Sequence, residues 1–130
     1  MKTTFKLRVR TYECDGYNHV NNAVYLQYLE AARHEFLKEI GIDYKGLISK
    51  GYGTYTARIE IDYKKSAFAD DELTIESRPI KKGAVSGVIE QIITRADDII
   101  ASAKVTWVFV DKTGTPVKIP PEFDVEGMYP

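Results

Sequence analysis

The apolar residues of this chain change their spacing twice, and this order constrains the fold more than any other feature of the sequence. Phe5–Tyr12 alternates apolar and polar side chains, which predicts a half-buried strand. From Ala23 to Ile40 the apolar side chains recur three and four residues apart, which predicts a broadly buried helix. After Gly53 the alternation returns. We therefore expect one long helix combined with several strands.

The rest of the chain predicts a weaker helical turn over Asp43–Lys50 and then four strands. These strands are expected at Tyr55–Tyr63, Glu72–Ile80, Val85–Arg95 and Ile99–Val110, with Lys81-Lys82-Gly83 and Ala96-Asp97-Asp98 as turns and an irregular tail from Thr113. Short turns favour an antiparallel meander of all four. The first strand must join the same sheet, because a lone strand is unstable. The predicted fold is α+β, a five-stranded antiparallel sheet curled around one long central helix in the order β-α-β-β-β-β.

The length and charge of the chain limit the kind of protein it can be. A chain of 130 residues is about one domain, and its 44% hydrophobic and 28% charged residues argue against disorder. Lys and Arg number 18 and Asp and Glu 19, for a net charge of −1. Non-specific nucleic-acid binding needs an excess of cations. We therefore expect a single domain over residues 1–130 that does not bind nucleic acid.

Other sequence features bear on cofactors and compartment. Cys14 is the one cysteine, so it cannot form an internal disulfide, and no Cys/His cluster suggests a metal site. The N-terminus has no apolar run like that of a signal peptide, and no stretch reaches the length of a membrane span. We expect a cytoplasmic protein with no membrane partner, no metal and no bound cofactor.

Reactive side chains are densest between Asp15 and Asn22, just before the predicted helix. A helix N-terminus offers unpaired N–H groups and partial positive charge, which can hold a polarised carbonyl oxygen. A carboxylate such as Asp15 beside that carbonyl can act as nucleophile or as general base. On spacing alone, the same residues also fit a structural role, with Asp15 capping a turn and Asn21 or Asn22 capping the helix. Gly41 is expected to end that helix.

The stretch Tyr12–Tyr25, which contains Asp15, resembles the signature of hotdog-fold thioesterases of the 4-hydroxybenzoyl-CoA thioesterase type. The resemblance continues through Tyr28, Glu30, Ala31, Ala32, Arg33 and Phe36, then Ile61-Asp62-Tyr63, Ala67, Asp71-Glu72-Leu73, Thr113-Gly114-Thr115-Pro116 and Ile119-Pro120. It thus covers about Phe5 to Phe123. Val20–Tyr25 and Arg33–Phe36 also look like the acyl-ACP and acyl-lipid thioesterases of plants. The resemblance implies a long helix wrapped by an antiparallel sheet, in agreement with the periodicity.

The resemblance also implies roles for individual residues. Asp15 would be the catalytic carboxylate, and the backbone N–H of Asn22 would polarise the thioester carbonyl. The benzoyl-CoA branch has Tyr at the Asn22 position, a change that a backbone donor tolerates. His19 and Asn18 stand where related enzymes place a pocket residue or a group that positions water. The implied reaction is hydrolysis of acyl-CoA or acyl-ACP, as in fatty acid metabolism, by a homodimer or homotetramer.

Several further residues are candidates for substrate contacts, each with a structural alternative. Tyr17, Tyr25, Tyr28 and Tyr63 would line an acyl tunnel, although aromatic residues at helical spacing are more often core. Lys64 and Lys65, like Lys81 and Lys82, would meet coenzyme A phosphates or else be solvated. Glu30 and Arg33 are spaced to pair on the helix.

Two other functions compete with hydrolysis. One is a hotdog dehydratase acting on hydroxyacyl thioesters, in which His19 would have to serve as the base. The other is a non-catalytic acyl-CoA-binding module, against which the presence of Asp15 argues. Cys14 has no base beside it in the sequence and is a weak candidate for a nucleophile.

Overall fold

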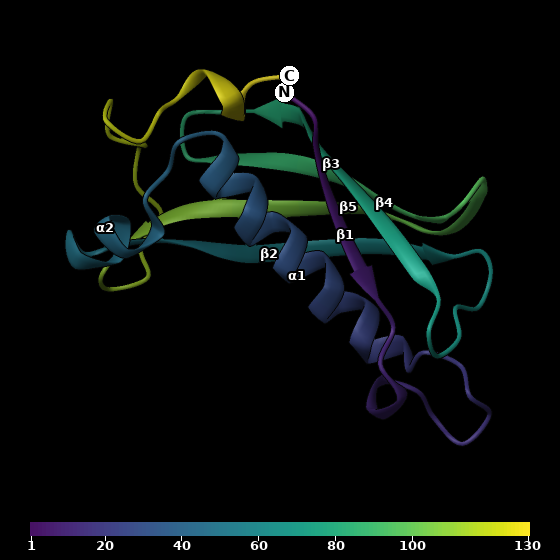
Figure 1. The fold of residues 1–130 in the computed structure, drawn as a ribbon. Coiled ribbons are helices and arrows are strands. Elements are labelled where there is room, and N and C mark those ends of the chain that lie inside the picture. Colours follow the sequence, from purple (N-terminus) through teal and green to yellow (C-terminus); the bar gives the residue numbers. More distant parts are fainter.

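A computed structural model describes residues 1–130, in which one helix crosses one antiparallel sheet (Figure 1). The five strands are β1 (Thr3–Arg8), β2 (Tyr52–Tyr63), β3 (Glu72–Lys82), β4 (Ser86–Arg95) and β5 (Asp98–Asp111), and the helices are α1 (Asn22–Glu39) and α2 (Tyr44–Ser49), with short 3-10 turns at Thr11–Glu13 and Glu126–Met128. The order across the sheet is β1-β3-β4-β5-β2. The predicted α+β fold is therefore confirmed.

The pairing of β2 differs from the predicted meander. Strands β3, β4 and β5 follow one another as hairpins, but β2 pairs with β5, for example Ile59 with Val105 and Tyr63 with Ala101. Strand β3 already has β1 and β4 as its neighbours, so the free side of β5 receives β2. The connection over residues 64–71 is not a tight turn and crosses to the other side of the sheet. Strands β1 and β2 are consequently the two edges.

Local side chains set both ends of α1. The side chain of Asn21 accepts a hydrogen bond from the Ala23 N–H at 2.9 Å, so Asn21 is the cap and Asn22 the first helical residue. Gly41 has φ +91°, a left-handed conformation that favours glycine just after a helix. The helix packs its apolar side on the sheet through Tyr25, Tyr28, Leu29, Ala32 and Phe36. Both predicted helix ends are correct to within one residue.

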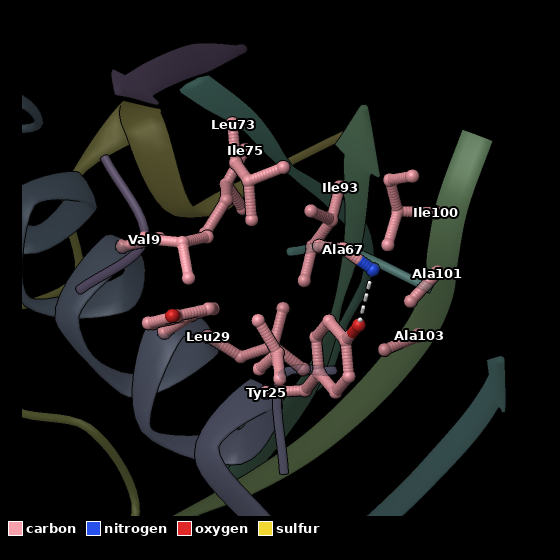
Figure 2. Close-up of a cluster of buried hydrophobic side chains, with 13 residues drawn as sticks. Val9, Tyr25, Leu29, Ala67, Leu73, Ile75, Ile93, Ile100, Ala101 and Ala103 are labelled. Carbon is pink, nitrogen blue, oxygen red and sulfur yellow. Dashed lines mark hydrogen bonds between the residues drawn. The ribbon is translucent and has the colours of Figure 1, made fainter. Parts of the chain in front are cut away.

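The main core joins α1 to the middle of the sheet (Figure 2). Its 13 buried residues include Leu29 from the helix, Ile75 and Ile93 from β3 and β4, and Ala101 from β5. Ala67, from the crossing segment 64–71, is buried in the same cluster. Leu29 is fully buried, so truncating it to Ala would cost about 2–5 kcal/mol of folding free energy.

Two strand boundaries depart from the predictions. Strand β1 ends at Arg8 rather than Tyr12, because the Glu13 carboxylate accepts the Arg10 N–H at 2.7 Å and turns the chain. Strand β3 includes Lys81 and Lys82, which were predicted in the turn.

Lys82 is also buried rather than solvated, with a side chain only 3% exposed. Its ammonium donates to the Gly83 carbonyl at 2.7 Å and lies 3.3 Å from the Asp124 carboxylate. Lys82 therefore links the C-terminal tail to the sheet.

No helix of the structure is both long and apolar enough to cross a membrane.

Candidate active site

The segment from Glu13 to Asn21 folds back on itself just before α1. The Asn21 N–H donates to the Glu13 carbonyl at 3.0 Å, and the Asp15 N–H donates to the His19 carbonyl at 2.8 Å. Asn18 stands at the tip with φ 64°, a left-handed conformation that Asn adopts more readily than most residues. We call residues 13–22 the helix-entry loop. Its first limb is residues 13–17, before the tip. Its second limb, residues 19–22, runs directly into the first turn of α1.

The Asp15 side chain is exposed and oriented by its own loop. Its Oδ1 accepts hydrogen bonds from the backbone N–H groups of Tyr17 at 2.9 Å and His19 at 3.4 Å. Its Oδ2 has no hydrogen-bond partner in the chain. One carboxylate oxygen is thus held in place while the other is available to a substrate or to water.

The N–H of Asn22 opens the first turn of α1 and has no acceptor within the chain. Asn21 caps the neighbouring N–H of Ala23, so the capping role falls to Asn21 rather than Asn22. The carbonyl of Asn22 accepts a hydrogen bond from the Tyr63 hydroxyl at 3.1 Å, which fixes the helix start against the end of β2. A free N–H at a helix N-terminus is suited to an oxyanion, because the helix dipole adds partial positive charge there.

His19 is half-buried and faces the crossing segment rather than a carboxylate. Its Nδ1 lies 3.4 Å from the Ser66 hydroxyl, and its ring packs edge-on against Phe68 at a centroid distance of 5.1 Å. No ion pair links His19 to an acidic residue. The base–acid pair that a dehydratase would need is therefore not formed by His19.

Ala67 holds the helix-entry loop and α1 together. Its carbonyl accepts the Val20 N–H at 2.9 Å, and its own N–H donates to the Tyr25 hydroxyl at 3.1 Å, the dashed line in Figure 2. Arg95 supports the same segment by donating to the Ser66 carbonyl at 3.0 Å. Sequence reasoning missed these supporting roles, because an alanine and a strand arginine carry no local sign of a contact made through the fold.

The other candidate residues are divided between the site and the core. Tyr17 is exposed beside His19, with ring centroids 6.4 Å apart. Tyr25 is buried in the core, and its ring lies 5.4 Å from that of Tyr63, which is 47% exposed. Tyr63 is thus the tyrosine that reaches both the surface and the start of α1.

The two lysines after β2 differ in their partners. Lys65 pairs with Asp98 at 2.8 Å, and this contact lowers the pKa of the Asp98 carboxyl. Lys64 is exposed and makes no ion pair, so its charge is available to an anion.

The expected pair of Glu30 with Arg33 is not formed, since Arg33 instead donates to Gln91.

Cys14 lies next to Asp15 but is unsuited to nucleophilic catalysis. Burial raises the pKa of its thiol, and the charges of Glu13 and Asp15 raise it further. A raised pKa leaves little thiolate at neutral pH. Its sulfur lies 3.8 Å from the Arg10 carbonyl.

Comparison with known proteins identifies the family. The model of the thioesterase-like superfamily matches residues 9–126. The chain is 34% identical over 108 residues to the long-chain acyl-CoA thioesterase FadM of Escherichia coli, covering 82% of this chain and 81% of that enzyme. It is 30% identical to the chloroplastic acyl-acyl carrier protein thioesterase ATL3 of Arabidopsis thaliana, covering 88% of this chain and 62% of that protein.

A solved structure agrees with this assignment. The crystal structure of a probable thioesterase from Bartonella henselae superposes with a TM-score of 0.89 at 27% identity, covering 92% of this chain and 100% of that one. The sequence match and the shared fold both extend over nearly the whole chain. The chain belongs to the thioesterase-like superfamily, and its fold is that of the hotdog thioesterases.

Proposed function

We propose that this thioester hydrolase acts on acyl groups carried by coenzyme A or acyl carrier protein, with Asp15 as its catalytic carboxylate. The observation that carries the proposal is the state of the Asp15 side chain, with Oδ1 held by two backbone N–H groups and Oδ2 free. The helix-entry loop joins this carboxylate to the free N–H of Asn22. A nucleophile or base and an oxyanion donor therefore belong to one short, internally bonded segment.

The chemistry needs only these two groups and water. In one route an Asp15 oxygen attacks the thioester carbon, the C–S bond breaks, and water hydrolyses the resulting anhydride. In the other route Asp15 takes a proton from water while the water oxygen attacks the same carbon. Both routes consume one water and release a carboxylic acid and a thiol. The Asn22 N–H stabilises the oxyanion in either route, and such a donor is typically worth about 10²–10³ in rate.

No metal or bound cofactor has a step in this reaction, because thiolate is a good leaving group. His19 contributes by packing: its contacts with Ser66 and Phe68 fix the second limb of the helix-entry loop. Lys64 is the cation best placed to meet a coenzyme A phosphate, since Lys65 is engaged by Asp98. Tyr17 and Asn18 belong to the helix-entry loop and Tyr63 contacts Asn22, so these residues would meet the thioester arm.

The proposed active form is a homodimer or a dimer of such dimers, joined through β2. Edge strand β1 carries Lys6 and Arg8, charges that oppose strand addition. Edge strand β2 is 12 residues long and exposes Tyr55 at 56% and Tyr63 at 47%. Antiparallel pairing of two β2 strands would bring the first residues of one copy beside the Tyr63 end of the other. Because Tyr63 contacts Asn22, the second copy would then cover the helix-entry loop.

The names of the relatives support the substrate class. FadM is named for long-chain acyl-CoA and ATL3 for acyl-acyl carrier protein. These names support thioesters of fatty acids as the substrates, and we propose that the chain takes part in cytoplasmic fatty acid metabolism.

The decisive experiment is a thiol-release assay over acyl-CoAs from acetyl to palmitoyl, with benzoyl-CoA included. We expect Asp15→Asn to lower turnover by about 10²-fold or more, the range of general base catalysis, without changing the melting temperature. Asp97→Asn, in the exposed β4–β5 turn, is the matched control and should behave as wild type. Wild-type turnover by Asp15→Asn would refute the assignment, and enoyl product without thiol release would identify a dehydratase.

A further inference from the structure

Arg33, in the second half of α1, is a half-buried cation without an ionic partner. Its Nη1 donates to the Gln91 Oε1 at 3.0 Å, and the guanidinium forms no ion pair with any carboxylate of the chain. Burial lowers the pKa of Arg33, and the charge of Glu30 opposes that effect. A cation that has lost part of its hydration in this way is stabilised by an anionic partner.

Gln91 holds the Arg33 side chain in a fixed orientation. Gln91 is fully buried, and its Nε2 donates to the Leu29 carbonyl and to the Ser77 hydroxyl, both at 3.0 Å. These two bonds fix the direction in which Gln91 Oε1 points toward Arg33. Since a guanidinium has five N–H donors in a rigid fork, the single bond to Gln91 leaves the others for a further acceptor.

Arg33 is one of the residues that line a mostly apolar cavity of about 70 Å³. This cavity lies between the second half of α1, the start of β2 and the middle of the sheet, and its apolar lining includes Phe36, Leu37, Ile89, Trp107 and Met128. It has room for roughly five water molecules, or a short chain of heavy atoms. Arg33 lies about 16 Å along α1 from Asn22, at about 1.5 Å per residue. The cavity is therefore separate from the helix-entry loop.

We propose that this cavity is a binding site for a free carboxylic acid with a short apolar body. The carboxylate would accept hydrogen bonds from the Arg33 fork, the geometry in which arginine binds carboxylates most strongly. The apolar body would lie against Phe36, Ile89 and Trp107. The apolar lining disfavours inorganic anions and acetate, and the cation disfavours neutral molecules of the same shape. The site is separate from Asp15 and its occupancy does not depend on the proposed hydrolysis.

Trp107 allows a direct test, because it is the only tryptophan of the chain and it lines the cavity. We would titrate the 130-residue protein with hexanoate, hexanamide and acetate and follow tryptophan fluorescence. The expected result is a saturable change with hexanoate at a dissociation constant at least tenfold below those of hexanamide and acetate. Equal affinities for hexanoate and hexanamide in the wild-type protein, or no saturable change, would overturn the proposal.

Variants locate the bound carboxylate. Arg33→Met should weaken hexanoate binding at least tenfold, and Arg78→Met, an exposed arginine on β3, is the matched control that should leave it unchanged. Gln91→Glu offers Arg33 a carboxylate from within the chain and should also abolish hexanoate binding. Retention of wild-type affinity by either Arg33→Met or Gln91→Glu would refute the site. No thioester is present in these assays, so their failure leaves the hydrolase proposal intact.

Discussion

The hydroxyl of Tyr28 in α1 donates a hydrogen bond to Oε1 of Glu13 across 2.9 Å. The same carboxylate accepts the Arg10 N–H at 2.7 Å, so Glu13 fastens the first limb of the helix-entry loop to both the helix and the preceding turn. Burial raises the pKa of Tyr28, and the hydrogen bond to Glu13 raises it further. The phenol therefore stays protonated and keeps its role as donor throughout the neutral range. Asp15 lies two residues after Glu13, so the contacts of Glu13 also restrain the position of Asp15.

Replacing Tyr28 with Phe should therefore loosen the loop that carries Asp15. A hydrogen bond to a charged group typically contributes about 1.5–3 kcal/mol, so we expect Tyr28→Phe to lower the free energy of unfolding by that amount. Turnover should fall as well, because Asp15 loses part of its positioning. Urea unfolding and thiol release measure the two effects. Tyr12→Phe, at a tyrosine that is 79% exposed, is the control. If Tyr28→Phe unfolds with the wild-type free energy, the hydrogen bond makes no net contribution to stability.

Substitutions at Asn22 can test the backbone N–H donor separately from the stability of the fold. As the first helical residue it has no N–H partner to lose, and proline is favoured at that position. Asn21, with ψ 136°, already has the extended conformation required before a proline. Asn22→Pro should thus keep the fold yet reduce turnover by about 10²–10³-fold, the usual effect of one oxyanion donor.

Asn22→Ala retains the N–H and leaves the cap on Asn21, so it should stay near wild-type turnover and stability. Steady-state kinetics with an acyl-CoA, together with thermal melting of both variants, provide the comparison. Equal kinetic losses in Asn22→Ala and Asn22→Pro would rule out the backbone N–H as the oxyanion donor.

The parts of this structure that could be predicted from sequence depend on local chemistry. The ends of α1 follow from Asn21 and Gly41, whose side chain and conformational freedom act within one turn. Strands β4 and β5 follow from alternation and a short turn between them. The helix-entry loop was also identified locally, from polar residues just ahead of a helix.

What the sequence did not reveal depends on contacts between distant segments. The placement of β2 beside β5 depends on which side of the sheet remains open, a property of the assembled sheet. Ala67 contacts Val20 and Tyr25 only after segment 64–71 has crossed the fold. Likewise the spacing of Glu30 and Arg33 favoured a surface pair, whereas Gln91, far along the chain, is the residue that Arg33 contacts.

The C-terminal tail should loosen in acid. Hydrogen bonds from the Tyr129 hydroxyl and the Lys82 ammonium lower the pKa of Asp124 below its ordinary value of 3.8. A lowered pKa in the folded state stabilises the fold above the ordinary pKa, and this stability is lost as pH falls below about 3.8. We therefore expect wild type to exceed Asp124→Asn in unfolding free energy at pH 6, with a smaller difference at pH 3. Urea unfolding at both pH values tests this, with Asp97→Asn as control, and a difference independent of pH would contradict it.

The last prediction concerns assembly through β2. Two antiparallel β2 strands related by a two-fold axis would meet near their middles, close to Ala57, which is exposed at the strand's irregularity between Thr56 and Arg58. Ala57→Lys would place two added ammonium groups near that axis, in the way that natural edge strands use lysine to prevent pairing. We expect light scattering coupled to size exclusion to give at least twice 14.7 kDa for wild type and 14.7 kDa for Ala57→Lys.

Thr4→Lys, on the opposite edge β1, is the matched control and should keep the wild-type mass, because Lys6 and Arg8 already oppose pairing there. If the second copy covers the helix-entry loop as proposed, Ala57→Lys should also lose most thiol-release activity, since Asp15 would then be open to bulk solvent. A wild-type chain that elutes as a monomer and still hydrolyses acyl-CoA would show that one copy makes a complete site. Assembly through β1 would instead be indicated if Thr4→Lys, and not Ala57→Lys, lowered the mass.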